Sequence, residues 1–174
     1  MTRKERLRRM AILCRHCLRN IAFYKTGRQD GGPILKSEFW ANVNGNFMDI
    51  CVLEWCKLFG EEKGKHYWKN VISEPDVFFK DLLKDTNTTE NGLKACKKEF
   101  RKYRDKFVAH LDSDRTMHIP HLGLAQKSTL YLYDYLLANE DDGEYFYGFP
   151  RNASKLYQHY LEMGESVYRK HKRC

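Results

Sequence analysis

The chain has 174 residues, of which 42% are hydrophobic, enough to bury one ordinary core, so we expect a single domain over 1–174. A formal net charge of +8 favours polyanionic partners such as RNA or DNA, because phosphates concentrate near a basic surface. The basic N-terminus does not lead into the apolar run of a secretory signal, and no later run reaches membrane-spanning length, so we expect a cytoplasmic protein without membrane contact.

The first predicted element is a helix from about Thr2 to Tyr24, which ends near the glycines of TGRQDGGP, a loop by composition. Apolar residues recur along it at steps of three and four, and Cys14 belongs to that stripe. Cys14 and Cys17 form a CxxC, but no second pair at ligand spacing completes a zinc site. We therefore expect buried thiols here, with half a zinc site as the alternative, and no metal or other cofactor.

A second helix is predicted from its cap, Ser37, to Gly60. Its expected buried stripe passes through Trp40, Val43, Phe47, Ile50, Glu54 and Leu58. Glu54 stands at the centre of that stripe, where a carboxylate is costly unless it meets a cation. We expect a cation from a later helix, with Arg104 the first candidate and Arg101 the second. A structural salt bridge elsewhere, or a place near water at the end of the bundle, is the alternative.

The rest of the chain also reads as helical. A short helix is predicted over 73–83 with Ser73 as its cap, and a long helix begins near Thr88 or Thr89. The apolar stripe of that long helix contains Leu93, Cys96, Phe100, Tyr103 and Phe107. No segment is predicted to form a β-hairpin.

Two more helices complete the expected fold. One is predicted over about 122–138, and the last runs from about Ala153 to His171 through Leu156, Tyr160, Met163 and Val167. The sequence therefore predicts an all-α protein, an up-and-down bundle of four to five long helices, in which sites are built from side chains on facing helices.

The segment YRDKFVAHLD (103–112) places Arg104 and His110 beside the apolar stripe of the third long helix. At about 100° per residue, the two residues fall on opposite flanks of the stripe, each about 60° from its centre. Both positions lie where the helix borders a neighbour, so both side chains are candidates to point into a groove between the two helices. In the alternative, Arg104 pairs with an acid and His110 is an ordinary residue near a helix end.

Arg104-Asp105 followed by His110, late in a helix of an all-α chain, resembles the R-x(4–6)-H motif of the HEPN superfamily (higher eukaryotes and prokaryotes nucleotide-binding). The longer run RDKFVAHLD, with LEWCKLFG upstream, is similar to the branch associated with abortive infection against phage. The resemblance implies a HEPN-like bundle and metal-independent RNA cleavage, as in toxins and antiviral defence. An antitoxin or another defence-system component is then a further candidate partner.

The residue types suit that reaction, because histidine transfers protons near neutral pH and arginine stabilises a charged phosphorane. We expect His110 to transfer the proton and Arg104 to hold the scissile phosphate, while Asp105 orients one of them and Lys106 adds positive field. A non-catalytic RNA-binding, protein-interaction or regulatory module of the same type is the alternative. A metal-dependent nuclease is disfavoured, because no carboxylate cluster appears in the sequence.

Helix geometry also bears on assembly. Residues six apart on an α-helix are separated by about 9 Å along the axis and about 120° around it, so one straight helix serves a single phosphate poorly with both Arg104 and His110. A two-fold dimer that places two copies of the motif around one cleft removes this difficulty, and HEPN nucleases, which the chain resembles, have such composite sites. We therefore expect a homodimer.

The segment GEYFYGFPRN (143–152) combines four aromatic residues with Arg151. Tyr145, Tyr147 and Arg151 are candidates for RNA binding, since aromatic faces beside basic residues stack unpaired bases. Arg101 is a further candidate for contact with nucleic acid. The alternative is that the aromatic side chains fold back and cover one end of the bundle.

Overall fold

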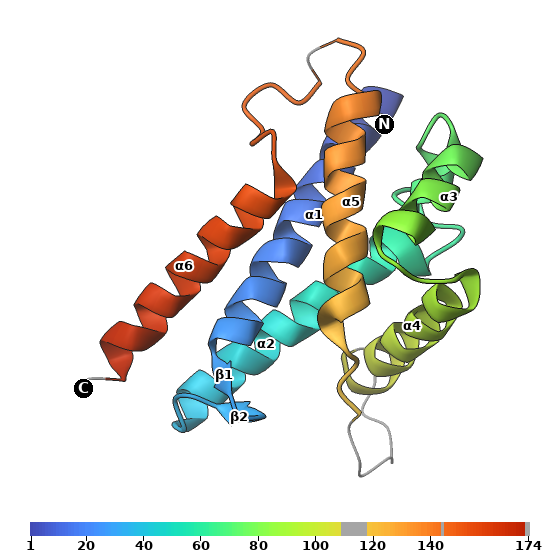
Figure 1. Cartoon of the computed structure of the whole chain (residues 1–174). Coiled ribbons are helices and arrows are strands. Elements are labelled where there is room, and N and C mark those ends of the chain that lie inside the picture. The colour runs from blue at the N-terminus through green and yellow to red at the C-terminus, as the bar shows by residue number, and fades with distance from the viewer. Residues whose placement is uncertain (109–117, 144, 173–174) are drawn as a thin grey trace.

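The computed structural model describes residues 1–108, 118–143 and 145–172, and this part of the chain is mostly helical (Figure 1). The elements in chain order are α1 (Arg3–Thr26), β1 (Arg28–Gln29), β2 (Gly32–Pro33), α2 (Glu38–Trp55), the π-helical turn η1 (Cys56–Gly60), the 3₁₀ turn η2 (Trp68–Asn70), α3 (Pro75–Asp85), α4 (Glu90–Tyr103), the π-helical turn η3 (Arg104–Val108), α5 (Leu122–Asn139) and α6 (Ala153–His171). The expected all-α composition is confirmed at this level.

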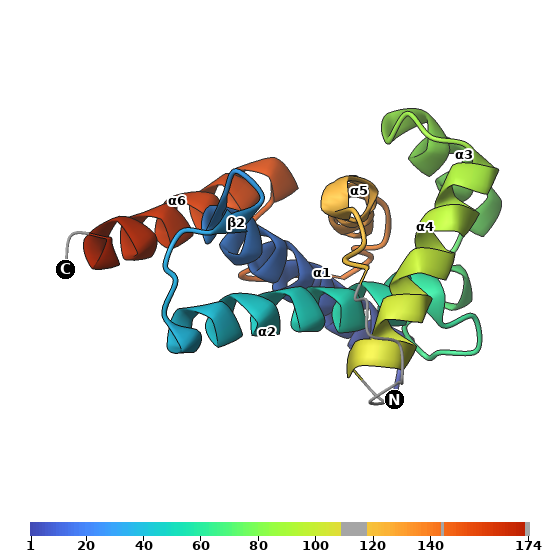
Figure 2. The same ribbon diagram turned by 90° about the horizontal axis from the view of Figure 1, so that it is seen from below.

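α1 is the central helix and packs against α2, α5 and α6. In Figure 1, α1 and α6 run downward along the chain, while α5 runs upward beside them. Figure 2 shows α6 at one edge of the molecule and α3 with α4 at the opposite edge. α4 contacts the turn η1 at the end of α2, so the two segments that carry the candidate site lie side by side.

Most helix ends follow the side chains that the sequence offers as caps. The hydroxyl groups of Ser37 and Thr89 accept hydrogen bonds at the starts of α2 and α4, and the Asn152 amide oxygen does so at the start of α6. Thr2 and Glu5 form a capping box at the start of α1. These local bonds explain why the predicted helix starts agree with the structure.

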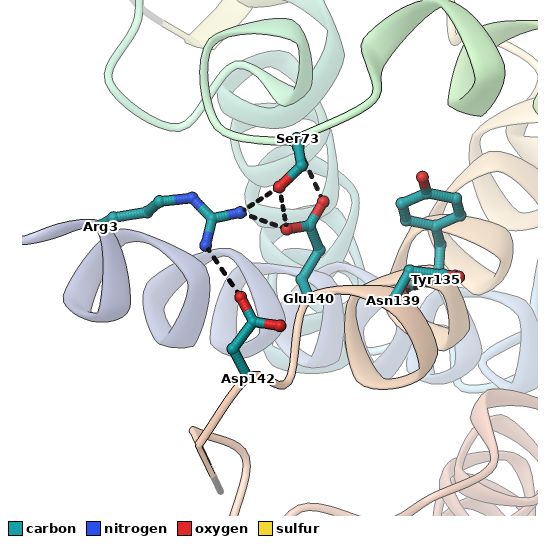
Figure 3. A network of polar contacts seen from close by, with 6 residues as sticks. All are labelled: Arg3, Ser73, Tyr135, Asn139, Glu140 and Asp142. Carbon is teal, nitrogen blue, oxygen red and sulfur yellow. Dashed lines mark hydrogen bonds and ion pairs between the residues drawn. The ribbon is translucent and has the colours of Figure 1, made fainter.

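Ser73 is an exception, because it does not cap α3. That helix begins at Pro75, and its N-cap residue, Glu74, makes no side-chain cap bond. Ser73 instead donates from its backbone N–H and its hydroxyl to the Glu140 carboxylate, at 2.8 and 2.9 Å. Arg3 contacts both residues, as Figure 3 shows, so a long-range network replaces the predicted local cap.

The expectation that no β-hairpin is present is wrong. β1 and β2 pair antiparallel, with Arg28 opposite Pro33. The two residues between them, Asp30 and Gly31, have positive φ angles of 50° and 78°. An Asp-Gly pair is a favoured sequence for such a two-residue turn, so the signal was present but lay inside a segment that composition marks as a loop.

The buried faces of two helices differ from the predicted stripes. In α2 the buried residues are Asn44, Met48, Cys51, Val52 and Trp55, while Ile50 is exposed. In α6 they are Ala153, Leu156, Tyr157, Tyr160, Gly164 and Tyr168, while Met163 and Val167 are exposed. Both real faces contain small or polar residues that a search for large apolar side chains passes over.

The buried side chains of the described residues form one hydrophobic cluster, to which all six α-helices contribute. Cys14 and Cys17 are fully buried in it as free thiols, and burial raises the pKa of Cys17 to about 12. Among the described helices, none combines the length and the apolar character needed to cross a lipid bilayer.

Candidate functional site

Arg104 occupies a change in helix geometry. The α-helix α4 ends at Tyr103, and the π-helical turn η3 begins at Arg104. The prediction of one regular α-helix through Phe107 is therefore wrong from Arg104 onward, as far as the described residues show, to Val108. A π-turn is wider than an α-turn, so the angular offsets calculated for a straight α-helix do not hold beyond Tyr103.

Arg104 is held by two carboxylates. Its Nη1 donates to Glu61 Oε1 at 2.9 Å, and its Nε and Nη2 lie 2.7 Å from Asp105 Oδ1. The Arg104 side chain is 18% exposed and that of Glu61 is 43% exposed. The hydrogen bond to Asp105 raises the pKa of the guanidinium, so this group is a permanent cation with a fixed orientation.

Glu61 reaches Arg104 because it follows a second π-helical turn. The turn η1 ends at Gly60, and Glu61 comes immediately after it. A Cβ atom at Gly60 would contact Cys56 and lie 3.8 Å from the Arg101 side chain, so the two chain segments approach closely here. Burial raises the pKa of the neighbouring Cys56 to about 12, against the opposing effect of Arg104, and Cys56 is therefore a neutral thiol.

The partner predicted for Glu54 is wrong. The Glu54 carboxylate is 12% exposed and its ion pair is with Lys57, one turn further along the same segment, at 3.2 Å. Arg104 binds Glu61 instead, and Arg101 is exposed. Glu54 lies at the border of the buried face of α2, not at its centre, so a local lysine is sufficient to accompany its charge.

His110 lies outside the described residues, so its distance from Arg104 is not part of the structure. Asp105 bonds the guanidinium, which is the orienting contact that the sequence interpretation assigned to it. Lys106 is half-buried in η3. The structure thus brings Arg104 and Asp105 together and adds Glu61, which the sequence analysis did not select.

A groove lies beside this ion-pair cluster. It has a volume of about 480 Å³ and is lined by Arg9, Leu13, Lys57, Glu61, Lys65 and His66. We call it the basic groove. Glu61 belongs both to its wall and to the ion pair with Arg104, so the groove and the motif share a boundary. Partial burial lowers the pKa of His66, and nearby Arg9 and Lys57 lower it further, so its imidazole is neutral at pH 7.

The aromatic segment near α6 divides into two parts. Phe146 and Phe149 are buried, and the guanidinium groups of Arg8 and Arg15, both on α1, lie over the Phe149 ring. Lys4 covers the half-buried Tyr145. Tyr147 is 81% exposed, while Arg151 pairs with Asp141 at 2.9 Å. The burial of these phenylalanines favours the alternative in which the aromatic side chains fold back on the helices, and base stacking stays a prediction for Tyr147.

Comparisons of the chain with protein-family models, with curated proteins and with solved structures give no match.

Proposed function

We propose that the chain is a metal-independent endoribonuclease of the HEPN type, in which Arg104 holds the scissile phosphate and His110 transfers the proton. The 2′-hydroxyl of the RNA loses its proton to water and attacks the adjacent phosphorus, the bond to the 5′-oxygen breaks as that oxygen takes a proton from the protonated His110 imidazole, and a 2′,3′-cyclic phosphate remains. Toxin-like or antiviral defence activity follows as the biological role.

One observation carries the proposal: Arg104 begins a π-helical turn, and its ion-pair partner Glu61 follows another. π-turns interrupt α-helices at a cost and occur frequently at functional sites. Here the guanidinium belongs to the first residue of one π-turn, and one of the two carboxylates that hold it belongs to the residue that follows the other. A fixed cation is what electrostatic stabilisation of a phosphorane requires, since no reorganisation is then needed during the reaction.

A second candidate function is a non-catalytic RNA-binding or protein-interaction module. The same ion pairs favour it, because Glu61 and Asp105 balance the charge of Arg104 and a phosphate must compete with them. The two candidates differ in one outcome, the formation of cleaved RNA.

Incubation of the purified protein with RNA in EDTA separates the candidates. We expect products with 2′,3′-cyclic phosphate ends, lost in both Arg104→Ala and His110→Ala. His159→Ala, an exposed histidine on α6, is the matched control and should cleave like the wild type. Binding without cleavage supports the module, and cleavage that EDTA abolishes supports a metal-dependent nuclease. A toxin-like enzyme should also slow host growth when overexpressed, and His110→Ala should relieve this effect.

A further inference from the structure

The basic groove is formed by two segments that are far apart in the chain. Arg9 and Leu13 lie one turn apart on α1, while Lys57, Glu61, Lys65 and His66 come from η1 and the segment that follows it. The groove therefore has a helix as one wall and a turn and loop as the other. Glu61, at its boundary, bonds Arg104 at 2.9 Å.

The charges of the basic groove are unevenly paired. Its carboxylate, Glu61, is already bonded to Arg104, and Lys57 is bonded to Glu54. Arg9 and Lys65 form no salt bridge with any residue in the described part of the chain. An anion that enters the groove thus meets two cations, Arg9 and Lys65, that no salt bridge within the described residues occupies, which favours its binding.

Two buried polar atoms add a second, independent observation. His66 Nε2 and Arg6 Nε have no hydrogen-bond partner among the described residues. His66 lines the groove, and the positive charge of Arg6 acts on its ring. Buried polar atoms are nearly always bonded, so an unsatisfied one marks a place for an acceptor. A phosphate oxygen is such an acceptor for the tautomer of His66 that carries its proton on Nε2.

We infer that the basic groove binds the sugar–phosphate backbone of single-stranded RNA and leads it to Arg104. Arg9 and Lys65 contact successive phosphates, His66 bonds one of them, and Glu61 marks the point where the strand reaches the guanidinium. The ligand is a single strand because one short groove with an apolar wall at Leu13 follows one backbone, whereas a duplex is recognised across its grooves by a wider surface. The inference rests on the proposed function only in taking RNA as the ligand.

Binding is measured with a single-stranded oligonucleotide whose 2′-hydroxyls are methylated, so that cleavage cannot occur. In Arg9→Gln/Lys65→Gln we expect about tenfold weaker binding. We also expect a dependence of log Kd on log salt that is shallower by about 1.4, from roughly 0.7 per phosphate contact. The matched control is Lys155→Gln/Lys172→Gln, called the α6 variant, which removes the same charge from two exposed positions, one on α6 and one directly after it.

Wild-type affinity in the groove variant overturns the inference, as does an equal loss in the α6 variant, because net charge alone then explains binding. Duplex RNA that competes as well as the single strand overturns it too. Thermal melts check that the variants are folded. If the double variant unfolds, binding is measured instead with the single variant Lys65→Gln, whose side chain is exposed. If the wild type binds through the groove but cleaves no RNA, the inference stands and the nuclease proposal fails. If the wild type cleaves RNA but the groove variant binds the methylated strand with wild-type affinity, the nuclease proposal stands and the inference about the groove fails.

Discussion

Arg104 is held differently by its two carboxylates. Asp105 is bonded by two guanidinium nitrogens and follows Arg104 directly in the chain, so it is a fixed part of the site. Glu61 is bonded by one nitrogen and comes from a distant segment of the chain. A phosphate that binds Arg104 therefore displaces Glu61 more readily than Asp105, and Glu61 is the residue that limits access to the guanidinium.

Glu61→Gln should strengthen binding of the methylated single strand about fivefold, the equivalent of roughly 1 kcal/mol, because a competing negative charge is removed. Its unfolding free energy should change by less than about 1 kcal/mol, since a partly exposed ion pair contributes little to stability. Affinity is measured by fluorescence anisotropy and stability by urea unfolding.

Glu62→Gln is the control for this change. Glu62 is adjacent in the chain, carries the same charge and is bonded to Lys97, not to Arg104. If both variants gain affinity equally, the loss of one negative charge explains the gain, and Glu61 has no special role.

At the scale of secondary-structure elements, Glu140 joins three parts of the fold. It is 1% exposed at the end of α5 and accepts hydrogen bonds from Arg3 at the start of α1 and from Ser73 before α3 (Figure 3). A buried carboxylate is stable only when donors surround it, so these contacts fix the relative positions of the elements.

Glu140→Gln should lower the free energy of unfolding by about 1–3 kcal/mol. One carboxylate oxygen is replaced by an NH₂ group, which donates hydrogen bonds and cannot accept those of Ser73 or Arg3. Asp142→Asn is the comparison, since Asp142 is exposed and lies 3.9 Å from Arg3. Its effect should stay below about 0.5 kcal/mol. Similar values for the two variants in urea unfolding would show that the network is not a structural joint.

Close packing of α6 on α1 depends on Gly164. A Cβ atom there would overlap the Thr26 hydroxyl and lie 3.3 Å from the Phe23 ring. Gly164→Ala should therefore destabilise the protein by about 1–3 kcal/mol, despite the better helix propensity of alanine. Gly45→Ala in α2 is the opposite case, because nothing lies within 4 Å of its added Cβ atom. It should stabilise by about 0.5–1 kcal/mol, and thermal melts of both variants decide whether the helix contact is as tight as described.

The helices themselves were predictable because their signals are local. α6 spans Ala153–His171 as predicted, and Ser37 and Thr89 cap the helices that they were expected to start. Which face of a helix is buried depends on its neighbours. In α6, Gly164 is buried because α1 approaches it closely, while the larger Met163 beside it is exposed. A pattern that counts large apolar residues cannot detect such a contact.

The candidate site shows the same division between local and long-range information. Sequence selected Arg104 and Asp105, which interact as neighbours. It missed Glu61, although a carboxylate directly after the terminal glycine of a helix is a candidate to meet a cation from another element. That pairing joins the first residue of one π-helical turn to the residue after another, and neither turn has a distinct pattern in this sequence.

At the scale of the whole molecule, the chain presents Arg104 at a boundary between α2 and α4 and beside the basic groove. The expectation of a dimer relied on α-helical geometry, which ends at Tyr103. A reason independent of that geometry is that all three guanidinium nitrogens of Arg104 already bond carboxylates, so one copy has few donors left for a phosphorane. A second copy of the motif across a two-fold axis would double the number of guanidinium groups at one cleft.

We therefore expect a homodimer in which two copies of Arg104 and His110 surround one cleft, and sedimentation should give the mass of two chains. Arg104→Ala and His110→Ala should each be inactive alone. Mixed after unfolding and refolding together, they should recover activity up to about half that of the wild type, because random pairing makes about half of the dimers mixed and each mixed dimer keeps one arginine and one histidine. Each variant refolded alone is the control. A monomer that cleaves RNA at full rate, or a mixture as inactive as its components, would show that the two motifs do not share a site.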